Sequence, residues 1–532
     1  MVKKFFKPNL MKILLTILLF VLTGFMVIRL MFPGLPNKFV LIAKILGFPL
    51  LFSMGMRLSI FFVLILVIEI LWLYIVSCVL MKIIIFIKNK LTAIRWGAKK
   101  FIVLGIIMIV GFIIYGLFNL GFGDIFIPKA DDSGATIEGV KDVVKANNQF
   151  SIDLYSEISK DSNDNIFFSP WSISTAVAMA YEGARGDTAN EIQSVFHFPE
   201  DDNVRRASFA KMLNTINKAG GKYKLHTANA IWLQEDYPFL EEYKDTISTY
   251  YLGEVKNIDF VNNPSQSSSQ INSWVLGHTN NKIKDIVSPD MFNDLTRAVL
   301  TNAIYFKGKW EHQFDRDDTK PGDFTLESGE KIKVEMMSLT DTDLEFNYAE
   351  SDGVQILEMQ YQGDKISMLV LLPRVGIDPY MTNVKFERER IEPKLSNLSH
   401  LESILSEEKL QEWRSKLKPQ SVYIYMPKYK FKTFYSLNDY LKSMGMSLAF
   451  GNADFSGMDG TKMLYIDKIL HKAYIDVYEE GTEAAASTAI VMTMGIKMPD
   501  YIFKADHPFI FIIQERETGN ILFIGRVNDP SE

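Results

Sequence analysis

The chain has 532 residues, a formal net charge of -6 and one cysteine, Cys78. A single cysteine excludes an intramolecular disulfide, so the fold must be stabilised by burial, and a chain longer than one ordinary domain has enough residues for a large core. The negative charge gives no indication of nucleic acid as a partner.

The first 120 residues consist mainly of Leu, Ile, Phe, Val and Met. Three apolar runs, 13–32, 59–87 and 101–120, are each long enough to cross a hydrocarbon core of about 30 Å as a helix. The first has too long an apolar core for a cleaved signal peptide, and no small-residue cleavage site follows it. A weaker run, 39–56, contains a lysine and the sequence Gly-Phe-Pro, and we expect it to be re-entrant, interfacial or part of one irregular crossing. We therefore predict that residues 1–120 form transmembrane helices whose partner is the lipid bilayer.

Basic residues indicate how these helices are oriented. Four lysines precede the first run, and five Lys or Arg residues lie between positions 88 and 100. Both stretches are expected on the cytoplasmic side, which requires an even number of crossings between them. Three crossings of the cell membrane then remain, and the chain after Leu120 is predicted to be extracytoplasmic. If the weaker run also spans, the large domain falls on the other side.

A polar, glycine-containing stretch, 121–136, is predicted to link this region to a soluble domain over 137–532. The domain begins with helical spacing over 140–160, a short strand ended by Pro170, and a buried helix over 172–181. Strand patterns dominate later, and they cover 366–372, 422–426, 509–513 and 521–524. The last two flank a Thr-Gly-Asn turn that is typical of a hairpin. Early helices and late strands indicate an α+β fold.

No catalytic motif stands out in the soluble part. There is no Gly-x-Ser-x-Gly, no His-Glu-x-x-His and no phosphate-binding glycine loop. The seven histidines show no metal-ligand spacing. We therefore predict neither a metal nor a cofactor, and a function other than catalysis.

The stretch 479–495 is unusual because small residues fill its first half and no charge follows Glu483. In a strand, one face would carry Thr482, Ala484, Ala486, Thr488, Ile490 and Met492, all uncharged. Such a segment suits a loop that slides between existing strands and becomes one of them. By itself it is equally consistent with an Ala-rich helix or an exposed loop.

Five other segments resemble signatures of the serpin family and occur in the family's order. They are 165–174 (NIFFSPWSIS), 301–310 (TNAIYFKGKW), 426–428 (MPK), 505–511 (ADHPFIF) and 519–530 (GNILFIGRVNDP). The resemblance covers residues 140–530, and the N-terminal 120 residues have no counterpart in it. It implies a monomeric domain with three β-sheets, eight or nine helices and an exposed reactive loop.

The resemblance also implies a mechanism. A target serine protease, or a cysteine protease, cleaves the loop, which then inserts into the large sheet and carries the acylated protease with it. Gly481 matches the hinge glycine, and the small residues after it are typical of inhibitory members. The implied hinge comprises Glu479, Glu480, Gly481, Thr482, Glu483, Ala484, Ala485, Ala486, Ser487 and Thr488.

Further residues are implied near the place where the sheet opens. Lys428 is the expected ion-pair partner of Glu479, and Trp310 matches the tryptophan at which insertion begins. A polar cluster beneath the sheet, where the strands part, is expected to consist of Ser169, Ser172, Asn272 and His471.

The scissile bond follows from the family's loop length. The fifteenth residue, counted from the hinge glycine as the first, is Gly495, which places the bond before Ile496. Glycine has no side chain for a specificity pocket. Met494 would suit an elastase-, chymotrypsin- or subtilisin-like enzyme, whereas Lys497 would suit a trypsin-like enzyme but needs a loop two residues longer. We favour Met494 or Gly495.

Three functions are compatible with these features. The first is a membrane-anchored inhibitor that traps a protease. The second is a non-inhibitory serpin that acts as a cleavable binding or chaperone module. The third gives the membrane region the main role, as a small channel or partner-binding module. The small residues of the hinge favour the first function over the second.

Overall fold

The computed structural model describes residues 129–531 apart from 161, 218–222, 376–395 and 483–498. The chain divides into two compact units, Met1–Ile125 and Phe126–Glu532, and the described residues belong to the second. Within these ranges, no helix combines the length and the apolarity that crossing a bilayer requires. Outside them lie the predicted membrane runs at 13–32, 39–56, 59–87 and 101–120.

Helix α7 (Ile137–Ser159) opens the domain. Its cap is Thr136, whose Oγ1 accepts a hydrogen bond from the backbone N–H of Gly139 at 3.0 Å. The predicted linker is bound to the domain at its described end. There the backbone N–H and C=O of Ala130 bond to the side-chain amide of Asn214 at 3.0 and 2.9 Å. The end of this stretch is therefore packed on α10 (Asp202–Asn217) and is no free spacer.

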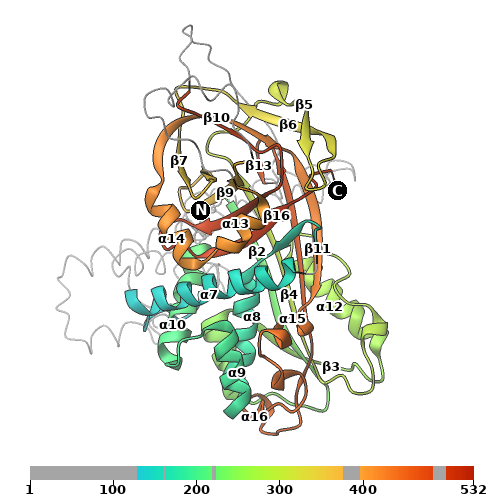
Figure 1. The fold of residues 1–532 in the computed structure, drawn as a ribbon. Coiled ribbons are helices and arrows are strands. Elements are labelled where there is room, and N and C mark those ends of the chain that lie inside the picture. Colours follow the sequence, from blue (N-terminus) through green and yellow to red (C-terminus); the bar gives the residue numbers. More distant parts are fainter. Residues whose placement is uncertain (1–128, 161, 218–222, 376–395, 483–498, 532) are drawn as a thin grey trace, which may run out of the picture. The chain divides into compact units, whose positions relative to one another are not determined.

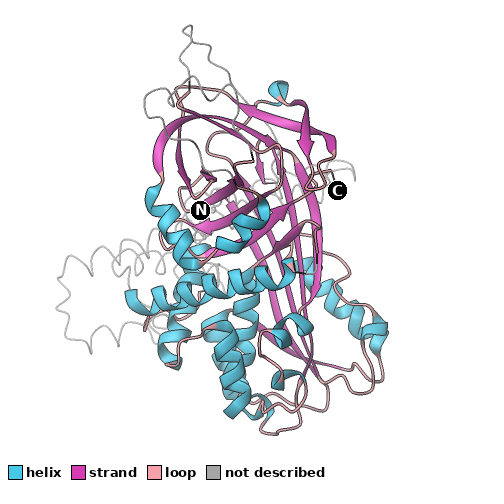
Figure 2. Ribbon diagram, in the orientation of Figure 1, coloured by secondary structure: helices cyan, strands magenta, loops and turns pink. Residues whose placement is uncertain are grey.

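Helix α8 (Pro170–Gly183) lies almost wholly in the core, as its Ala- and Met-rich sequence predicts. Ser169 caps it by accepting the backbone N–H of Ser172 at 3.2 Å, and Pro170 occupies the first turn, where a missing N–H costs nothing. The other described α-helices are α9 (Gly186–Phe196), α11 (Glu241–Thr246), α12 (Pro264–His278), α13 (Leu398–Ile404), α14 (Glu407–Lys416), α15 (Asn438–Ser443) and α16 (Ser456–Asp459). Most helices gather in the lower half of the view in Figure 2, and strands fill the upper half.

The large sheet has the strand order β11-β12-β13-β4-β2-β3. Its strands are β2 (Tyr223–Gln234), β3 (Glu254–Ile258), β4 (Ala298–Lys309), β11 (Tyr429–Ser436), β12 (Ile466–Tyr478) and β13 (Gly481–Thr482). One face packs on α8 and the main core, whereas the other forms a smaller core with α12, in which Val299 and Leu470 meet Ile271 and Val275. The long strands run side by side through the domain (Figure 1).

The second sheet runs β1-β16-β15-β9-β8-β7-β10-β6-β5, and β14 also pairs with β10. The three sheets that we predicted are therefore two among the described residues. Strand β10 joins the parts, because its residues 418–421 pair with β7 and its residues 424–427 pair with β6. These strands are β1 (Ile166–Phe168), β5 (Lys320–Thr325), β6 (Lys331–Leu339), β7 (Glu345–Ser351), β8 (Val354–Gln360), β9 (Ile366–Pro373), β10 (Lys418–Pro427), β14 (Tyr501–Lys504), β15 (Phe509–Glu515) and β16 (Ile521–Val527). The predicted hairpin is confirmed, since β15 and β16 pair antiparallel.

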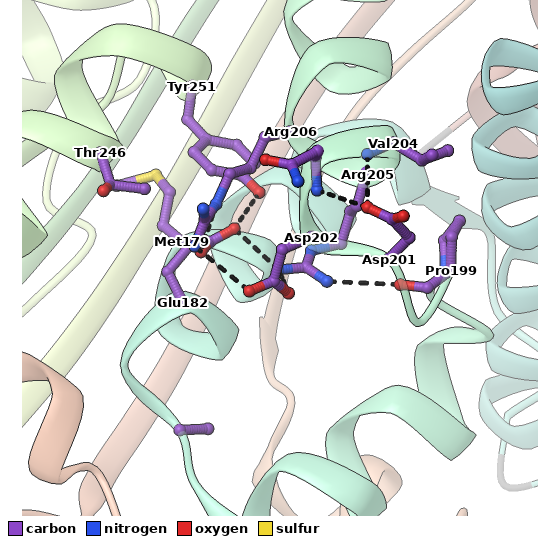
Figure 3. A network of polar contacts seen from close by, with 12 residues as sticks. Met179, Glu182, Pro199, Asp201, Asp202, Val204, Arg205, Arg206, Thr246 and Tyr251 are labelled. Carbon is purple, nitrogen blue, oxygen red and sulfur yellow. Dashed lines mark hydrogen bonds and ion pairs between the residues drawn. The ribbon is translucent and has the colours of Figure 1, made fainter. Parts of the chain in front are cut away.

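A buried ion-pair network fastens the end of α8 to α10 (Figure 3). Glu182 Oε1 accepts hydrogen bonds from Arg205 Nη2 at 3.0 Å and from the hydroxyl of Tyr251 at 2.6 Å, and its Oε2 accepts from Arg206 Nη2 at 2.6 Å. Burial and the Glu182 carboxylate raise the pKa of Tyr251 well above its usual value, which keeps the phenol a donor. The network balances a buried charge that would be costly if unpaired.

Candidate functional site at the seam of the large sheet

Strands β4 and β12 are parallel neighbours, and we call the line along which they meet the seam. Residues 466–474 of β12 pair with residues 298–305 of β4. At the upper end of the seam the two-residue strand β13 lies between them and is antiparallel to both. Gly481 pairs with Lys309 and Tyr478, and Thr482 pairs with Gly308 and Val477. The start of the predicted hinge is thus already part of the sheet.

Gly481 occupies a position that other residues cannot take. Its φ is +148°, in the region that favours glycine, and a Cβ added there would lie 2.1 Å from the backbone oxygen of Gly308. The close approach of the two backbones therefore requires glycine at the turn from β12 into β13.

The turn itself is held by two buried carboxylates. Glu479 Oε1 accepts hydrogen bonds from Lys428 Nζ at 3.1 Å, which is the predicted ion pair, and from Thr319 Oγ1 at 2.9 Å. Burial raises the pKa of Glu479, but hydrogen bonds from its own backbone N–H, Thr319 and Lys428 outweigh it and hold the pKa below its usual range. Glu480 Oε1 accepts from Arg316 Nη2 at 2.7 Å.

Trp310 lies at the end of β4 beside β13, where the sequence resemblance implied it. Its indole N–H donates to the backbone oxygen of Tyr478 at 3.1 Å, and its backbone N–H donates to the oxygen of Glu480 at 2.9 Å. The indole stacks on Tyr361 with ring centroids 4.4 Å apart, and the Tyr361 hydroxyl bonds to Thr482 Oγ1 at 2.8 Å. Thr482 therefore points into the core.

The polar cluster lies on the same face of the seam, farther from β13. His471 of β12 is directly opposite Asn302 of β4, and the His471 Nδ1–H donates to Asn302 Oδ1. His471 Nε2 accepts the backbone N–H of Ser169 at 3.1 Å. Asn302 Nδ2 donates to Ser172 Oγ and to Asn229 Oδ1, both at 2.5 Å. Burial lowers the pKa of His471 to about 3, so the imidazole is neutral and donates from one nitrogen only.

The prediction of Asn272 as a cluster member is wrong. Asn272 lies in α12, on the opposite face of the sheet, where its side-chain amide bonds to the backbone N–H and C=O of Val287 at 3.1 and 2.8 Å. The asparagine of the cluster is Asn302, joined by Asn229. The sequence carried a signal for Asn302, because it shares the inward parity of Leu300 and Ile304 in an apolar strand, and a buried amide there needs polar partners.

The remaining predicted site residues lie outside the described part of the chain. They are the hinge residues Glu483, Ala484, Ala485, Ala486, Ser487 and Thr488 and the scissile-bond candidates Met494, Gly495, Ile496 and Lys497. Across the part that is described, no group of three or more His, Cys, Asp or Glu side chains could hold a metal ion.

Comparisons with known proteins agree with this geometry. The family model described as Serpin (serine protease inhibitor) matches residues 145–530. The chain belongs to the serpin family. An uncharacterized serpin-like protein of Thermococcus kodakarensis is 44% identical over 396 residues, which cover 74% of this chain and 87% of that protein. The leukocyte elastase inhibitor of Equus caballus is 36% identical over 393 residues, or 72% of this serpin and 98% of the relative.

A solved structure shows the same fold. The crystal structure of Serpin48, a highly specific serpin in the insect Tenebrio molitor, matches with a TM-score of 0.62 at 33% identity. The match covers 73% of this serpin and 98% of that chain. The serpin fold that the motifs implied is therefore confirmed for the large domain.

Proposed function

We propose that this serpin is a membrane-anchored inhibitor that traps a serine protease by loop cleavage, loop insertion and a covalent bond. The observation that carries the proposal is β13. This strand begins at the hinge glycine and already lies between β4 and β12, antiparallel to both, and its Thr482 side chain points into the core. The rest of the loop can extend this strand.

The register of β13 supports full insertion. If it continues, Ala484 lies opposite Phe306 and Ile475, and Thr488 lies opposite Asn302 and His471. Every second residue then faces the core, and from Thr482 to Met492 these residues are uncharged. Insertion replaces one parallel pairing with two antiparallel pairings, which are more stable per residue. The sheet therefore gains stability when the loop enters.

The chemistry of the trap belongs to the protease. Its serine hydroxyl adds to the carbonyl of the cleaved residue, the amine of the next residue leaves, and an ester joins the two proteins. In the register above, Met492 lies opposite Ala298, the first residue of β4, so an ester at Met494 or Gly495 lies just beyond the sheet. Insertion then pulls the protease to the end of the seam opposite β13 before water can hydrolyse the ester.

The membrane anchor rests on the three apolar runs and their basic flanks. We propose three crossings of the cell membrane, with the inhibitory domain outside the cytoplasm. The name of one relative, leukocyte elastase inhibitor, supports a serine protease as the target class. Of the two favoured scissile residues, Met494 would suit an elastase-like pocket.

A panel of proteases tests the proposal. The full-length chain in detergent is incubated with elastase-, chymotrypsin-, subtilisin- and trypsin-like enzymes and run on a denaturing gel. We expect a covalent complex with at least one of the first three, and mass analysis of the released peptide locates the cleaved bond. Cleaved serpin together with fully active protease in every case would reject trapping and favour a non-inhibitory binding role.

A further inference from the structure

The loop between α12 and the short helical turn at Pro289–Met291 crosses the outer face of the large sheet. From this loop Lys282 places its ammonium group 5.9 Å from the ring centroids of both Tyr305 and Tyr474. The two tyrosines are directly paired across the seam, Tyr305 on β4 and Tyr474 on β12, with ring centroids 6.3 Å apart. One cation therefore contacts both strands.

A second lysine ties the same loop to one side of the seam. Lys472 of β12 donates from Nζ to the backbone oxygens of Lys284 at 2.8 Å and Asp285 at 3.2 Å. The loop holds a tight path, since Asn280, Asn281 and Asp285 have φ values of 50°, 61° and 52°. Such positive values cost energy for any residue except glycine, and contacts of the surrounding structure must offset that cost.

We propose that Lys282 and the tyrosine pair form a latch that holds the seam closed below β13, and that release of this latch limits the rate at which the loop inserts. The proposal rests on the proposed function and names its regulation. A strand that enters the seam moves β4 and β12 from about 4.8 Å to about 9.6 Å apart. At its present height over the pair, the ammonium group would then lie more than about 6 Å from the ring centroids.

The latch is also met early during insertion. In the register of β13, the third residue after Thr482 arrives between Tyr305 and Tyr474, whereas the sixth arrives between Asn302 and His471. The inserting strand must therefore displace Lys282 before it reaches the polar cluster.

The neighbouring lysines supply a matched control. Lys430 and Lys432 of β11 also approach the Tyr474 ring, at 5.8 and 5.6 Å from its centroid. Both come from the side of β12 that faces away from β4, so neither contacts the two strands that must separate. Removing the charge of Lys430 changes the electrostatics of Tyr474 without removing a contact across the seam.

The test measures seam opening without a protease. A labelled peptide with the sequence of residues 482–492 is added to the full-length chain in detergent, and its rate of incorporation is followed for wild type, Lys282→Met and Lys430→Met. Loss of one or two cation–aromatic contacts predicts incorporation at least about threefold faster for Lys282→Met. We expect Lys430→Met to stay within about twofold of wild type and Lys282→Arg, which keeps the charge, to restore the slow rate.

Two results would overturn the latch. One is equal incorporation by Lys282→Met and Lys430→Met, and the other is a peptide that enters no variant. Lys472→Met removes a different contact between the loop and β12, and it should also speed incorporation. This variant replaces Lys282→Met in the test if Lys282→Met folds poorly. Covalent capture of a protease is measured separately. The latch can therefore fail while the chain proves to be an inhibitor, and the chain can fail to trap a protease while the latch is supported.

Discussion

His471 shows how much one buried side chain decides at the residue scale. It bonds to Asn302 directly across the seam and to the start of α8 through the backbone N–H of Ser169. Neutral imidazole satisfies both bonds, because one nitrogen donates and the other accepts. A protonated ring would present a second donor to the Ser169 N–H, so the cluster depends on the uncharged form.

This dependence predicts sensitivity to acid. Burial lowers the pKa of His471 from 6.5 to about 3. Between pH 6.5 and about 3, the unfolded chain therefore binds a proton at this histidine that the folded chain does not bind. The contribution of neutral His471 to the free energy of unfolding is complete above pH 6.5 and is lost as the pH falls from 6.5 toward 3. Between pH 6.5 and 5 the residue should remove up to about 1.4 kcal/mol of unfolding free energy per pH unit. Urea unfolding checks this, and His471→Gln should flatten the slope; an unchanged slope would refute the role.

Gly481→Ala is the second prediction at the residue scale. A methyl group 2.1 Å from the Gly308 oxygen cannot be accommodated, so β13 should leave the sheet. The backbone N–H of Trp310, which now donates to Glu480, should then exchange its hydrogen at least about tenfold faster. Gly329→Ala is the control, because that glycine also has positive φ but open space around it. Unchanged exchange at Trp310 in Gly481→Ala would contradict the account.

At the scale of elements, the proposed function depends on a pair of strands that can accept a third. β4 and β12 are the two parallel neighbours between which β13 lies, and the large sheet is antiparallel on both flanks of this pair. The inward face of the seam meets the main core, and the outward face meets α12 and its loop. An inserting strand must therefore present uncharged side chains inward and displace the loop outward.

Thr482→Arg tests the inward requirement. Thr482 is buried and bonds to Tyr361, so an arginine there would place an unpaired charge in the core. We expect the variant to be cleaved at the same bond but to form less than about a tenth of the wild-type covalent complex, because the loop no longer inserts before the ester is hydrolysed. Gel densitometry of complex against cleaved product measures this ratio. Wild-type trapping by Thr482→Arg would show that β13 does not begin the inserted strand.

At the scale of the whole molecule, the proposed membrane topology decides on which side of the membrane the domain lies and therefore which proteases it can meet. An extracytoplasmic domain encounters secreted or external enzymes, whereas the four-crossing alternative would place it in the cytoplasm. The basic stretches before the first run and at 88–100 favour three crossings.

Protease treatment of intact cells that express the full chain tests this topology. With three crossings, an added protease should cut the loop or remove the domain while a cytoplasmic marker stays intact. Removing charge tests what sets this topology. When the basic residues at 88–100 are replaced with neutral ones, a smaller share of the chains should insert with the domain outside the cytoplasm. A domain that is protected in intact cells and cut only after lysis would establish the opposite orientation.

The sequence by itself determined the family, the α+β class, α7, α8, the β15–β16 hairpin, and the residues Gly481, Lys428, Trp310, Ser169, Ser172 and His471. The elements follow from periodicity and turn residues, and the family and the named residues follow from its sequence motifs; all of these signals are local in the chain. Only the tertiary structure decided what meets across the seam. It replaced Asn272 with Asn302, joined two expected sheets through β10, bound the end of the linker to α10, and placed Lys282 over a tyrosine pair. Each of these depends on contacts between segments far apart in sequence, which no local pattern encodes.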